Sequence, residues 1–186
     1  MTRIIAGSLG GRRLQVPPAG TRPTSERVRE ALFSALENDP GLDGVDVLDL
    51  CAGSGALGIE ALSRGARHAL FVESDRRAAA TLRRNLTDLG LAGVGEVRTA
   101  TAAAVLGKPA DRPYRLVLAD PPYDVPVAEI TGWLVDADRH GWLDSEATVV
   151  VERPRERRGP GFAFPEGITG TRERRYGDTV LHVGVR

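Results

Sequence analysis

Residues 47–58 read VLDLCAGSGALG, a short apolar run followed by a glycine-rich loop and a helix-forming stretch. Gly53, Gly55 and Gly58 match the pattern G-x-G-x-x-G, in which glycines let the backbone approach a bound ligand closely. Glu73 comes 20 residues after Gly53, at the end of the next predicted strand, where a carboxylate can accept hydrogen bonds from both ribose hydroxyls. These residues predict a site for a nucleoside cofactor.

Strands and helices alternate along the chain around this loop. The strands predicted in the alternating part cover residues 45–50, 69–72, 96–99, 114–119 and 147–151. The predicted helices cover residues 26–38 (capped by Ser25), 56–64, 75–89, 102–106 and 127–138. Apolar strands that alternate with helices form a parallel sheet with helices on both faces. Two further runs, 168–176 and 179–185, flank Gly177-Asp178 as an antiparallel hairpin, so we predict a seven-stranded, mostly parallel sheet of the α/β class.

The N-terminal residues are predicted to form a small extension. Runs at 3–6 and 12–16 flank a glycine-rich turn and indicate a β-hairpin, and the prolines that follow indicate an extended linker. We therefore divide the chain into a hairpin extension over residues 1–22 and one α/β domain over residues 23–186. A length of 186 residues leaves room for one compact domain with such an appendage.

The composition excludes several classes of protein. One cysteine cannot form an internal disulfide, and the three histidines are too scattered for a zinc cluster, so we expect no metal site. No apolar run approaches the roughly 18 residues that a membrane span needs, and the first residues lack the apolar core of a signal peptide. We expect a cytoplasmic protein without a membrane partner, and a monomer as the simplest assembly.

The net charge of zero hides a segregation of charge along the chain. The sequence has 25 basic and 25 acidic residues, but residues 1–30 and 153–175 each carry a net charge of +4, and residues 31–152 carry −8. Such an asymmetry is typical of a protein of which one face meets a polyanion. On charge alone, this interpretation and that of solvated surface arginines have equal weight.

A second motif, Asp120-Pro121-Pro122-Tyr123, directly follows the predicted strand 114–119. Ligands of open α/β sheets bind beyond the carboxyl ends of the strands, and two prolines hold the backbone rigid there. The Asp120 carboxylate and the Pro121 carbonyl can then accept both hydrogens of an exocyclic amino group, which directs its lone pair towards an incoming methyl group. Tyr123 offers a face on which a flipped-out base can stack.

Two features favour S-adenosylmethionine (SAM) over a nicotinamide dinucleotide as the cofactor. Asp49 lies before the glycine loop, where a carboxylate attracts the cationic amino-acid part of SAM and repels a pyrophosphate. The motif at Asp120 is the second feature. A nicotinamide-dependent oxidoreductase would need a catalytic histidine or a Tyr/Lys pair, and the single lysine, Lys108, lies outside any pocket motif.

Residues 49–58, Glu73 and Asp120–Tyr123 together resemble the class I SAM-dependent methyltransferases that act on amino groups of bases. Further matching stretches are RIIAG at 3–7, GRRL at 11–14, RPTSERVRE at 22–30 and YGDT at 176–179. With them, the chain is similar to the bacterial 16S ribosomal RNA guanine-N2 methyltransferases over essentially its whole length. The glycine loop is generic, and Asp-Pro-Pro-Tyr is shared with N6-adenine enzymes, so the arginine-flanked opening is the specific part.

The resemblance implies a Rossmann-like class I methyltransferase fold and methylation of the N2 amino group of one guanine in 16S rRNA, in an assembled or partly assembled 30S subunit. The catalytic residues that it implies are Asp120, Pro121, Pro122 and Tyr123. The SAM-binding residues that it implies are Asp49, Ala52, Gly53, Ser54, Gly55, Glu73, Ser74, Thr101 and Ala102. The chain departs from the family pattern at 99–102, which reads TATA where such enzymes often have Asp or Asn near the adenine, so the Thr101 hydroxyl or backbone groups would substitute.

Arginines near both ends of the chain are predicted to bind RNA phosphates, because guanidinium groups are planar and always charged. They are Arg3, Arg12, Arg13, Arg22, Arg27, Arg174 and Arg175. Two other functions stay open at this point. An N6-adenine methyltransferase of DNA or RNA would need a target-recognition insertion, for which 186 residues leave little room. A ribosome-assembly factor that binds SAM or RNA without turnover would not need the intact motif at Asp120–Tyr123.

Overall fold

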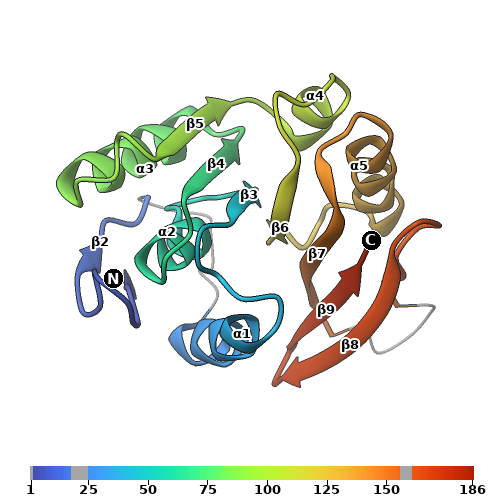
Figure 1. The fold of residues 1–186 in the computed structure, drawn as a ribbon, viewed down its shortest axis with the longest axis horizontal. Helices are drawn as coiled ribbons and strands as arrows, with labels where there is room; N and C mark the ends of the chain where they lie inside the picture. The colour runs from blue at the N-terminus through green and yellow to red at the C-terminus, as the bar shows by residue number, and fades with distance from the viewer. Residues whose placement is uncertain (1, 18–24, 156–160) are drawn as a thin grey trace.

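A seven-stranded sheet forms the centre of the molecule (Figure 1). The structure is a computed structural model that describes residues 2–17, 25–155 and 161–186. The strands of the sheet are β3 (Asp46–Leu50), β4 (His68–Glu73), β5 (Gly95–Thr99), β6 (Tyr114–Ala119), β7 (Leu143–Pro154), β8 (Thr169–Tyr176) and β9 (Thr179–Val185). They lie in the order β5-β4-β3-β6-β7-β9-β8; the first five in that order are parallel, and β9 is antiparallel to both of its neighbours. The predicted fold class is confirmed.

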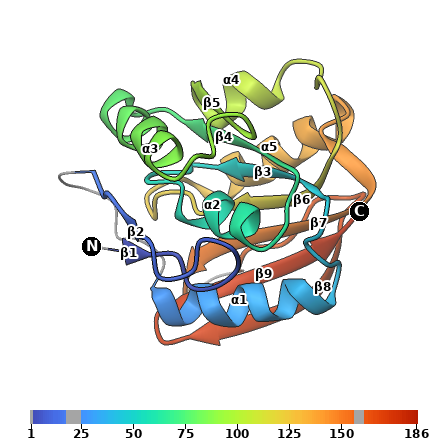
Figure 2. The ribbon, with the colours of Figure 1, turned by 60° about the vertical axis from the view of Figure 1, so that its left-hand side comes forward.

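Helices cover both faces of this sheet, as predicted (Figure 2). They are α1 (Glu26–Asn38), α2 (Ala56–Ser63), α3 (Arg76–Asp88), α4 (Ala102–Leu106) and α5 (Val127–Arg139). Alternate strand residues face different cores, so Val47 packs with α1, α2 and α3, whereas Leu48 packs with α4 and α5. Among the described residues, no helix has the length and apolar character that crossing a membrane would require.

Side-chain caps fix where three of the helices begin. Ser25, Asp75 and Thr101 each accept a hydrogen bond from the backbone N–H three residues later, at the starts of α1, α3 and α4. The N-cap predicted at Ser25 is therefore confirmed. Thr101 has a structural task that the sequence analysis did not assign to it.

The strand β7 is longer than the predicted run 147–151. It begins at Leu143, which pairs with Tyr114 ahead of a register shift between β6 and β7. It continues to Pro154 because its last residues pair with β9, where Pro154 lies opposite Thr179. Pairing with β9 thus extends the strand beyond the apolar run from which it was predicted.

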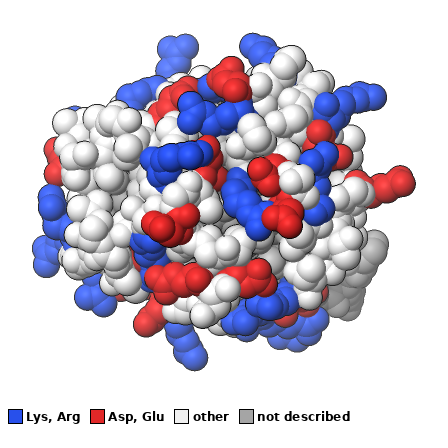
Figure 3. Space-filling model, in the orientation of Figure 1, with Lys and Arg blue, Asp and Glu red and all other residues white. Residues whose placement is uncertain are grey.

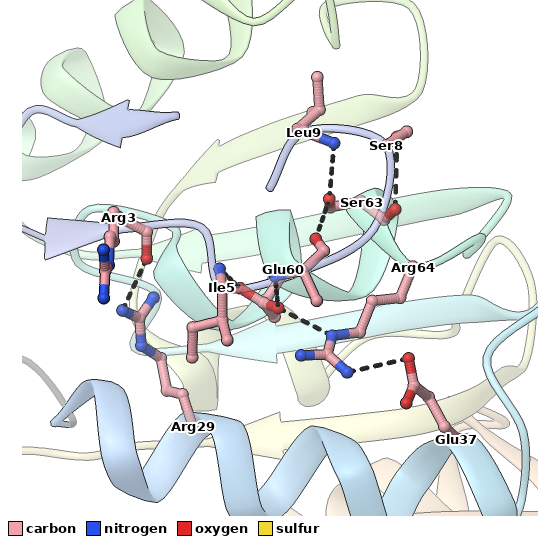
Figure 4. Close-up of polar contacts among 10 residues, drawn as sticks. Arg3, Ile5, Ser8, Leu9, Arg29, Glu37, Glu60, Ser63 and Arg64 are labelled. Atoms are coloured by element: carbon pink, nitrogen blue, oxygen red, sulfur yellow. Dashed lines mark hydrogen bonds and ion pairs between the residues drawn. The ribbon is translucent and has the colours of Figure 1, made fainter. Parts of the chain in front are cut away.

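The N-terminal hairpin has shorter strands than the predicted runs 3–6 and 12–16. Only β1 (Thr2–Arg3) and β2 (Arg13–Leu14) pair as strands. The amides that follow β1 bond to α2 instead (Figure 4). The Glu60 carboxylate accepts hydrogen bonds from Ile5 N–H at 2.7 Å and from Ala6 N–H at 3.1 Å.

The helix α2 is buried along its whole length, and Glu60 has no exposed surface. A buried carboxylate is costly unless charged or polar groups surround it. Besides the two amides, Arg64 bonds to Glu60 at 2.8 Å and to Glu37 of α1 at 2.9 Å. One turn on, the Ser63 hydroxyl accepts a hydrogen bond from Leu9 N–H at 3.0 Å (Figure 4). The hairpin, α1 and α2 therefore meet around one buried charge.

Apolar side chains of the hairpin belong to the main core. Ile4 and Leu14 are 0% and 2% exposed, and both pack in the cluster that contains α1, α2 and α3. The hairpin thus contributes apolar side chains to the hydrophobic core on this face of the sheet. The boundary proposed between residues 22 and 23 falls at positions outside the described residues, and the division of the chain there stays a prediction.

Replacement of Glu60 by alanine tests how much the docked hairpin contributes to stability. Glu60→Ala leaves two backbone amides without their acceptor and removes a partner of Arg64, so we expect urea unfolding to report a loss of about 2–4 kcal/mol. Glu60→Gln keeps one carbonyl oxygen and should lose less. An alanine variant as stable as the wild-type protein would contradict this account of the docking.

Candidate active site

A cavity of about 540 Å³ opens at the carboxyl ends of β3, β4 and β6. Of the predicted cofactor and catalytic residues, those that line it are Asp49, Ala52, Gly53, Ser54, Glu73, Ser74, Asp120, Pro121, Pro122 and Tyr123. The residues that line it without having been predicted are Val16, Cys51, Ala56, Leu57, Asp75 and Asp124. Two motifs some 70 residues apart in sequence therefore meet at one site.

The glycine loop follows β3 in a tight, left-handed turn. Gly53 has a φ of 55° and Gly55 a φ of 83°, values that residues other than glycine rarely adopt. A Cβ on Gly55 would lie 2.2 Å from Leu82, and one on Gly58 would lie 2.3 Å from Phe71. The last two glycines thus serve the packing of the loop against the core. Gly55 is not among the residues that line the cavity, and its contact with a cofactor stays a prediction.

Glu73 is held in the cavity wall by the backbone. One carboxylate oxygen accepts a hydrogen bond from Gly53 N–H at 2.8 Å and the other from Asp75 N–H at 2.7 Å. Each oxygen of an ionised carboxylate can accept a further hydrogen bond. The side chain is therefore fixed in orientation and still able to accept hydroxyl donors.

Asp49 is a nearly fully buried carboxyl group at the base of the cavity. It is 1% exposed; one oxygen accepts a hydrogen bond from Gly58 N–H at 2.9 Å, and the other has no hydrogen-bond partner within the described part of the chain. Burial raises the pKa of Asp49 to about 8, with smaller contributions from the nearby Asp120 and Glu73 carboxylates, against the lowering effect of the Gly58 amide. A cation in the cavity would relieve this unfavourable burial of charge.

The catalytic motif begins where β6 ends. The Asp120 N–H donates to the carbonyl of Leu50 at the end of β3 at 3.4 Å. This backbone contact places Asp120 beside the glycine loop. Pro121 is buried, whereas Tyr123 is 44% exposed and stands at the cavity mouth. The motif thus has a rigid, buried start and an accessible aromatic ring.

Arg153 holds the loop that contains this motif, and the sequence analysis did not find it. It is 5% exposed and donates hydrogen bonds to the carbonyls of Val125 at 3.0 Å, Pro122 at 3.4 Å and Tyr123 at 3.5 Å. The sequence analysis counted Arg153 as part of a basic C-terminal segment. Its position two residues after the apolar run 147–151 is the one signal of a buried arginine that we find in the sequence.

Asn85 joins the cavity wall to the N-terminal segment. Its side-chain amide donates to Ser54 C=O at 2.9 Å and to Gln15 C=O at 3.0 Å, and its oxygen accepts from Gln15 N–H at 2.9 Å. Val16, the residue after Gln15, lines the cavity. One buried side chain on α3 therefore positions both the glycine loop and a piece of wall that comes from outside the sheet.

Thr101 and Ala102 are at the start of α4 and do not line the cavity. The Thr101 hydroxyl accepts a hydrogen bond from Ala104 N–H at 3.2 Å, as the helix cap. Contacts between these two residues and a cofactor stay a prediction, and the structure supplies a separate reason for a threonine at this position.

The arginines predicted to bind RNA occupy separate parts of the molecule. Arg3 pairs with Glu26 at 3.0 Å and Arg12 donates to the Asp88 carbonyl at 3.1 Å, both on the hairpin, whereas Arg175 pairs with Glu173 on β8, the last strand of the sheet order. The side chains that are exposed without a described ion pair are Arg13, Arg27 and Arg174. Arg22 lies outside the described residues. Figure 3 shows basic and acidic groups interspersed over one face, without a single-sign patch that covers it.

Arg29 and Arg153 contribute to the two basic segments of the sequence, but not to the surface. Arg29 is 0% exposed and donates to Thr2 Oγ1 at 2.7 Å and to the Arg3 carbonyl at 2.9 Å. Desolvation by burial lowers the pKa of Arg29, while Glu60 and Glu26 raise it. The exposed positive charge is therefore smaller than the sequence count indicates.

Comparison with known proteins identifies the family. The family model "Conserved hypothetical protein 95" matches residues 2–185. The chain belongs to this family. A relative in Bacillus subtilis, "Putative rRNA methyltransferase YlbH", is 37% identical over 183 residues, 95% of each protein. "Ribosomal RNA small subunit methyltransferase D" of Escherichia coli is 42% identical over 151 residues, 81% of this chain and 73% of that protein.

Solved structures agree with the family assignment. The "Putative methyltransferase yhhF from Escherichia coli" matches with a TM-score of 0.86 and 37% identity, over 100% of this chain and 97% of that one. The magnesium protoporphyrin IX methyltransferase of Synechocystis, crystallised with SAM, matches at 16% identity with a TM-score of 0.65 over 86% of this chain and 78% of that one, and shares the fold. The family member described here is a class I methyltransferase, and SAM is its cofactor.

The residues of the cavity fit SAM. The Asp49 oxygen without a partner is suited to the cationic methionine part, and the fixed Glu73 carboxylate is suited to the two ribose hydroxyls. The Glu73 and Asp120 carboxylates that line the cavity would repel the additional pyrophosphate of a nicotinamide dinucleotide.

The raised pKa of Asp49 predicts pH-dependent binding of SAM. The free protein holds this carboxyl group protonated below a pKa of about 8, whereas a cation binds its ionised form. We expect the affinity for SAM to increase between pH 6 and pH 8, by up to about tenfold per pH unit. Isothermal titration calorimetry measures this, and Asp49→Asn should bind SAM more weakly with a flatter pH profile. Parallel profiles for the two proteins would argue against a role of Asp49 in binding the cation.

Arg153→Met tests the support of the catalytic loop. The variant lacks the donors to three loop carbonyls, so we expect the rate of methyl transfer at saturating substrate to fall by at least about tenfold, with the SAM affinity within twofold of wild type. Arg155→Met removes an exposed arginine two residues away and is the matched control. Equal rates in both variants would show that Arg153 does not position the loop.

Proposed function

We propose that this methyltransferase transfers the methyl group of SAM to the exocyclic N2 amino group of a guanine in 16S rRNA, within an assembled or partly assembled 30S subunit. The observation that carries the proposal is the position of Asp120–Tyr123 at the mouth of the cofactor cavity. The relatives named as rRNA methyltransferases support RNA as the substrate. The protein would act as a cytoplasmic monomer.

The two acceptors at the start of the motif would orient the amino group. The Asp120 carboxylate and the Pro121 carbonyl each accept one N–H of the guanine N2, which withdraws its lone pair from the ring and directs it into the cavity. The buried Pro121 and the hydrogen bonds from Arg153 keep the acceptors from turning away. Exposed Tyr123 would stack on the base after it leaves its helix.

Bound SAM supplies an electrophilic methyl group on a sulfonium, which leaves as a neutral thioether. Asp120, which would accept a hydrogen bond from the N2 amino group, would take the surplus proton as the nitrogen lone pair bonds to the methyl carbon and the thioether departs. Asp49 would hold the methionine part of the cofactor and Glu73 its ribose, so that positioning would carry most of the rate.

Two alternatives remain distinguishable by experiment. An N6-adenine methyltransferase uses the same Asp-Pro-Pro-Tyr chemistry, because N6 of adenine is also an exocyclic amino group. A ribosome-assembly factor without turnover would bind SAM and RNA but form no product. The described chain is a single compact methyltransferase fold with a small hairpin, and the described residues include no recognition insertion of domain size.

The deciding experiment is transfer of labelled methyl from SAM to 30S particles that lack native modifications, followed by identification of the modified nucleoside. We expect N2-methylguanosine. N6-methyladenosine would establish the first alternative, and the absence of incorporation would overturn the proposed activity.

Asp120→Ala tests the catalytic role of the motif in the same assay. The variant lacks one of the two acceptors for the amino group, so we expect methyl transfer to fall by at least about 10³-fold while SAM still binds measurably. Asp111→Ala removes an exposed aspartate outside the cavity and is the control. If Asp120→Ala keeps wild-type activity, the catalytic assignment is wrong.

A further inference from the structure

The helix α3 carries a group of arginines that the site described above does not use. They are Arg76, Arg77, Arg83 and Arg84, and all four are exposed. None forms an ion pair with another described residue, although Arg83 donates hydrogen bonds to Val97 C=O and Thr99 Oγ1 of β5. The only acidic residue of the helix is Asp88, in its last turn.

The charges of Arg76, Arg77 and Arg83 are not placed to stabilise α3. Arg76 and Arg77 occupy the first turn, where the helix dipole favours acidic residues and disfavours basic ones. The residues four positions after Arg76, Arg77 and Arg83 are uncharged, so these arginines lack the acidic partners that stabilise exposed helices. Acidic partners within α3 therefore do not account for three of the four charges.

Their placement links the cavity to the N-terminal hairpin. The cap residue Asp75 lines the cavity, so Arg76 and Arg77 stand at its rim. At the other end of the helix, Arg12 of the hairpin donates to the Asp88 carbonyl. The ribbon views show the hairpin strand β2 beside α3 (Figures 1 and 2). Between these ends the helix is about 18 Å long, enough to follow several phosphates of one strand.

Arg77 and Arg84 lie on the side of α3 that faces the hairpin. They are seven residues, or two turns, apart and so lie one above the other. Arg84 precedes Asn85, which bonds to Gln15, and lies one turn before Asp88, whose carboxylate accepts from Gln15 Nε2. Arg77, Arg84 and Arg12 therefore form one basic track that begins at the cavity rim.

We propose that this basic track binds the phosphate backbone of the substrate RNA next to the nucleotide that enters the cavity. The inference rests on the proposed function, since it presumes an RNA substrate. Guanidinium groups spaced along one helix neutralise successive phosphates without reading the bases. The track adds α3 to the arginines near the chain ends, and it places RNA contacts directly beside the cofactor site.

The test is the salt dependence of binding to 30S particles that lack native modifications, at 50–200 mM KCl and fixed Mg²⁺. Arg77→Gln/Arg84→Gln keeps two strong helix formers and removes two positive charges. Each lost phosphate contact lowers the magnitude of the slope of log affinity against log salt by about 0.7–0.9, so for two lost contacts we expect a slope smaller by about 1.5–2 and an affinity lower by about tenfold at 100 mM KCl. SAM affinity, measured in the same preparations, should stay unchanged.

The matched control is Arg112→Gln/Arg139→Gln, which removes the same charge from exposed arginines before β6 and at the end of α5. It should retain the wild-type slope. An α3 variant with the wild-type slope, or an equal loss in both double variants, would overturn the proposal. If one of these two outcomes is found and the wild-type protein still methylates the particles, the α3 proposal fails and the proposed function stands. If it transfers no methyl group, the proposed function fails instead.

Discussion

The hydrogen bonds from Ile5 and Ala6 to the buried Glu60 carboxylate determine how one face of the molecule is assembled. A helix buried on all sides, such as α2, has no solvent for a charged residue, so neighbouring segments must satisfy that charge. The N-terminal hairpin supplies amides, and Arg64 supplies the compensating charge and connects to Glu37 of α1. Because α2 begins at the glycine loop, the same contacts hold the wall of the cofactor cavity.

The cavity itself concentrates negative charge. Asp49, Glu73 and Asp120 lie at the carboxyl ends of three neighbouring strands and all line it. Burial is the main cause of the raised pKa of Asp49, and the two neighbouring carboxylates add to it. Such an arrangement is typical of functional sites, where a cationic ligand offsets the repulsion. Among the described residues that line the cavity, none is basic: Arg153 lies behind the catalytic loop and contacts its carbonyls, and the arginines of α3 are exposed outside it.

The sequence predicted the features that depend on local patterns. The strand, glycine loop and helix at 47–58, the carboxylate of Glu73 and the turn of prolines after β6 each follow from residue types within a short window. Features that depend on distant partners were not predicted. Arg153 looks like one more basic surface residue until β9 and the catalytic loop surround it, and the N-terminal strands look longer because nothing local shows that Glu60 takes their amides. The alternation of apolar and polar residues predicts which face of the sheet a side chain lies on. It does not predict which distant residue that side chain contacts.

Asn85 connects segments that are synthesised at very different times. Its partner Gln15 precedes it by 70 residues, and Ile5 precedes Glu60 by 55. At about 5–20 residues per second, the hairpin is synthesised roughly 3–11 seconds before Glu60 of α2 and roughly 4–14 seconds before Asn85 of α3. Until then its amides are hydrogen-bonded to water. The wall at Val16 can form only after α3 has emerged, and the wall at Asp120–Tyr123 later still, so the cavity is complete only in the second half of synthesis.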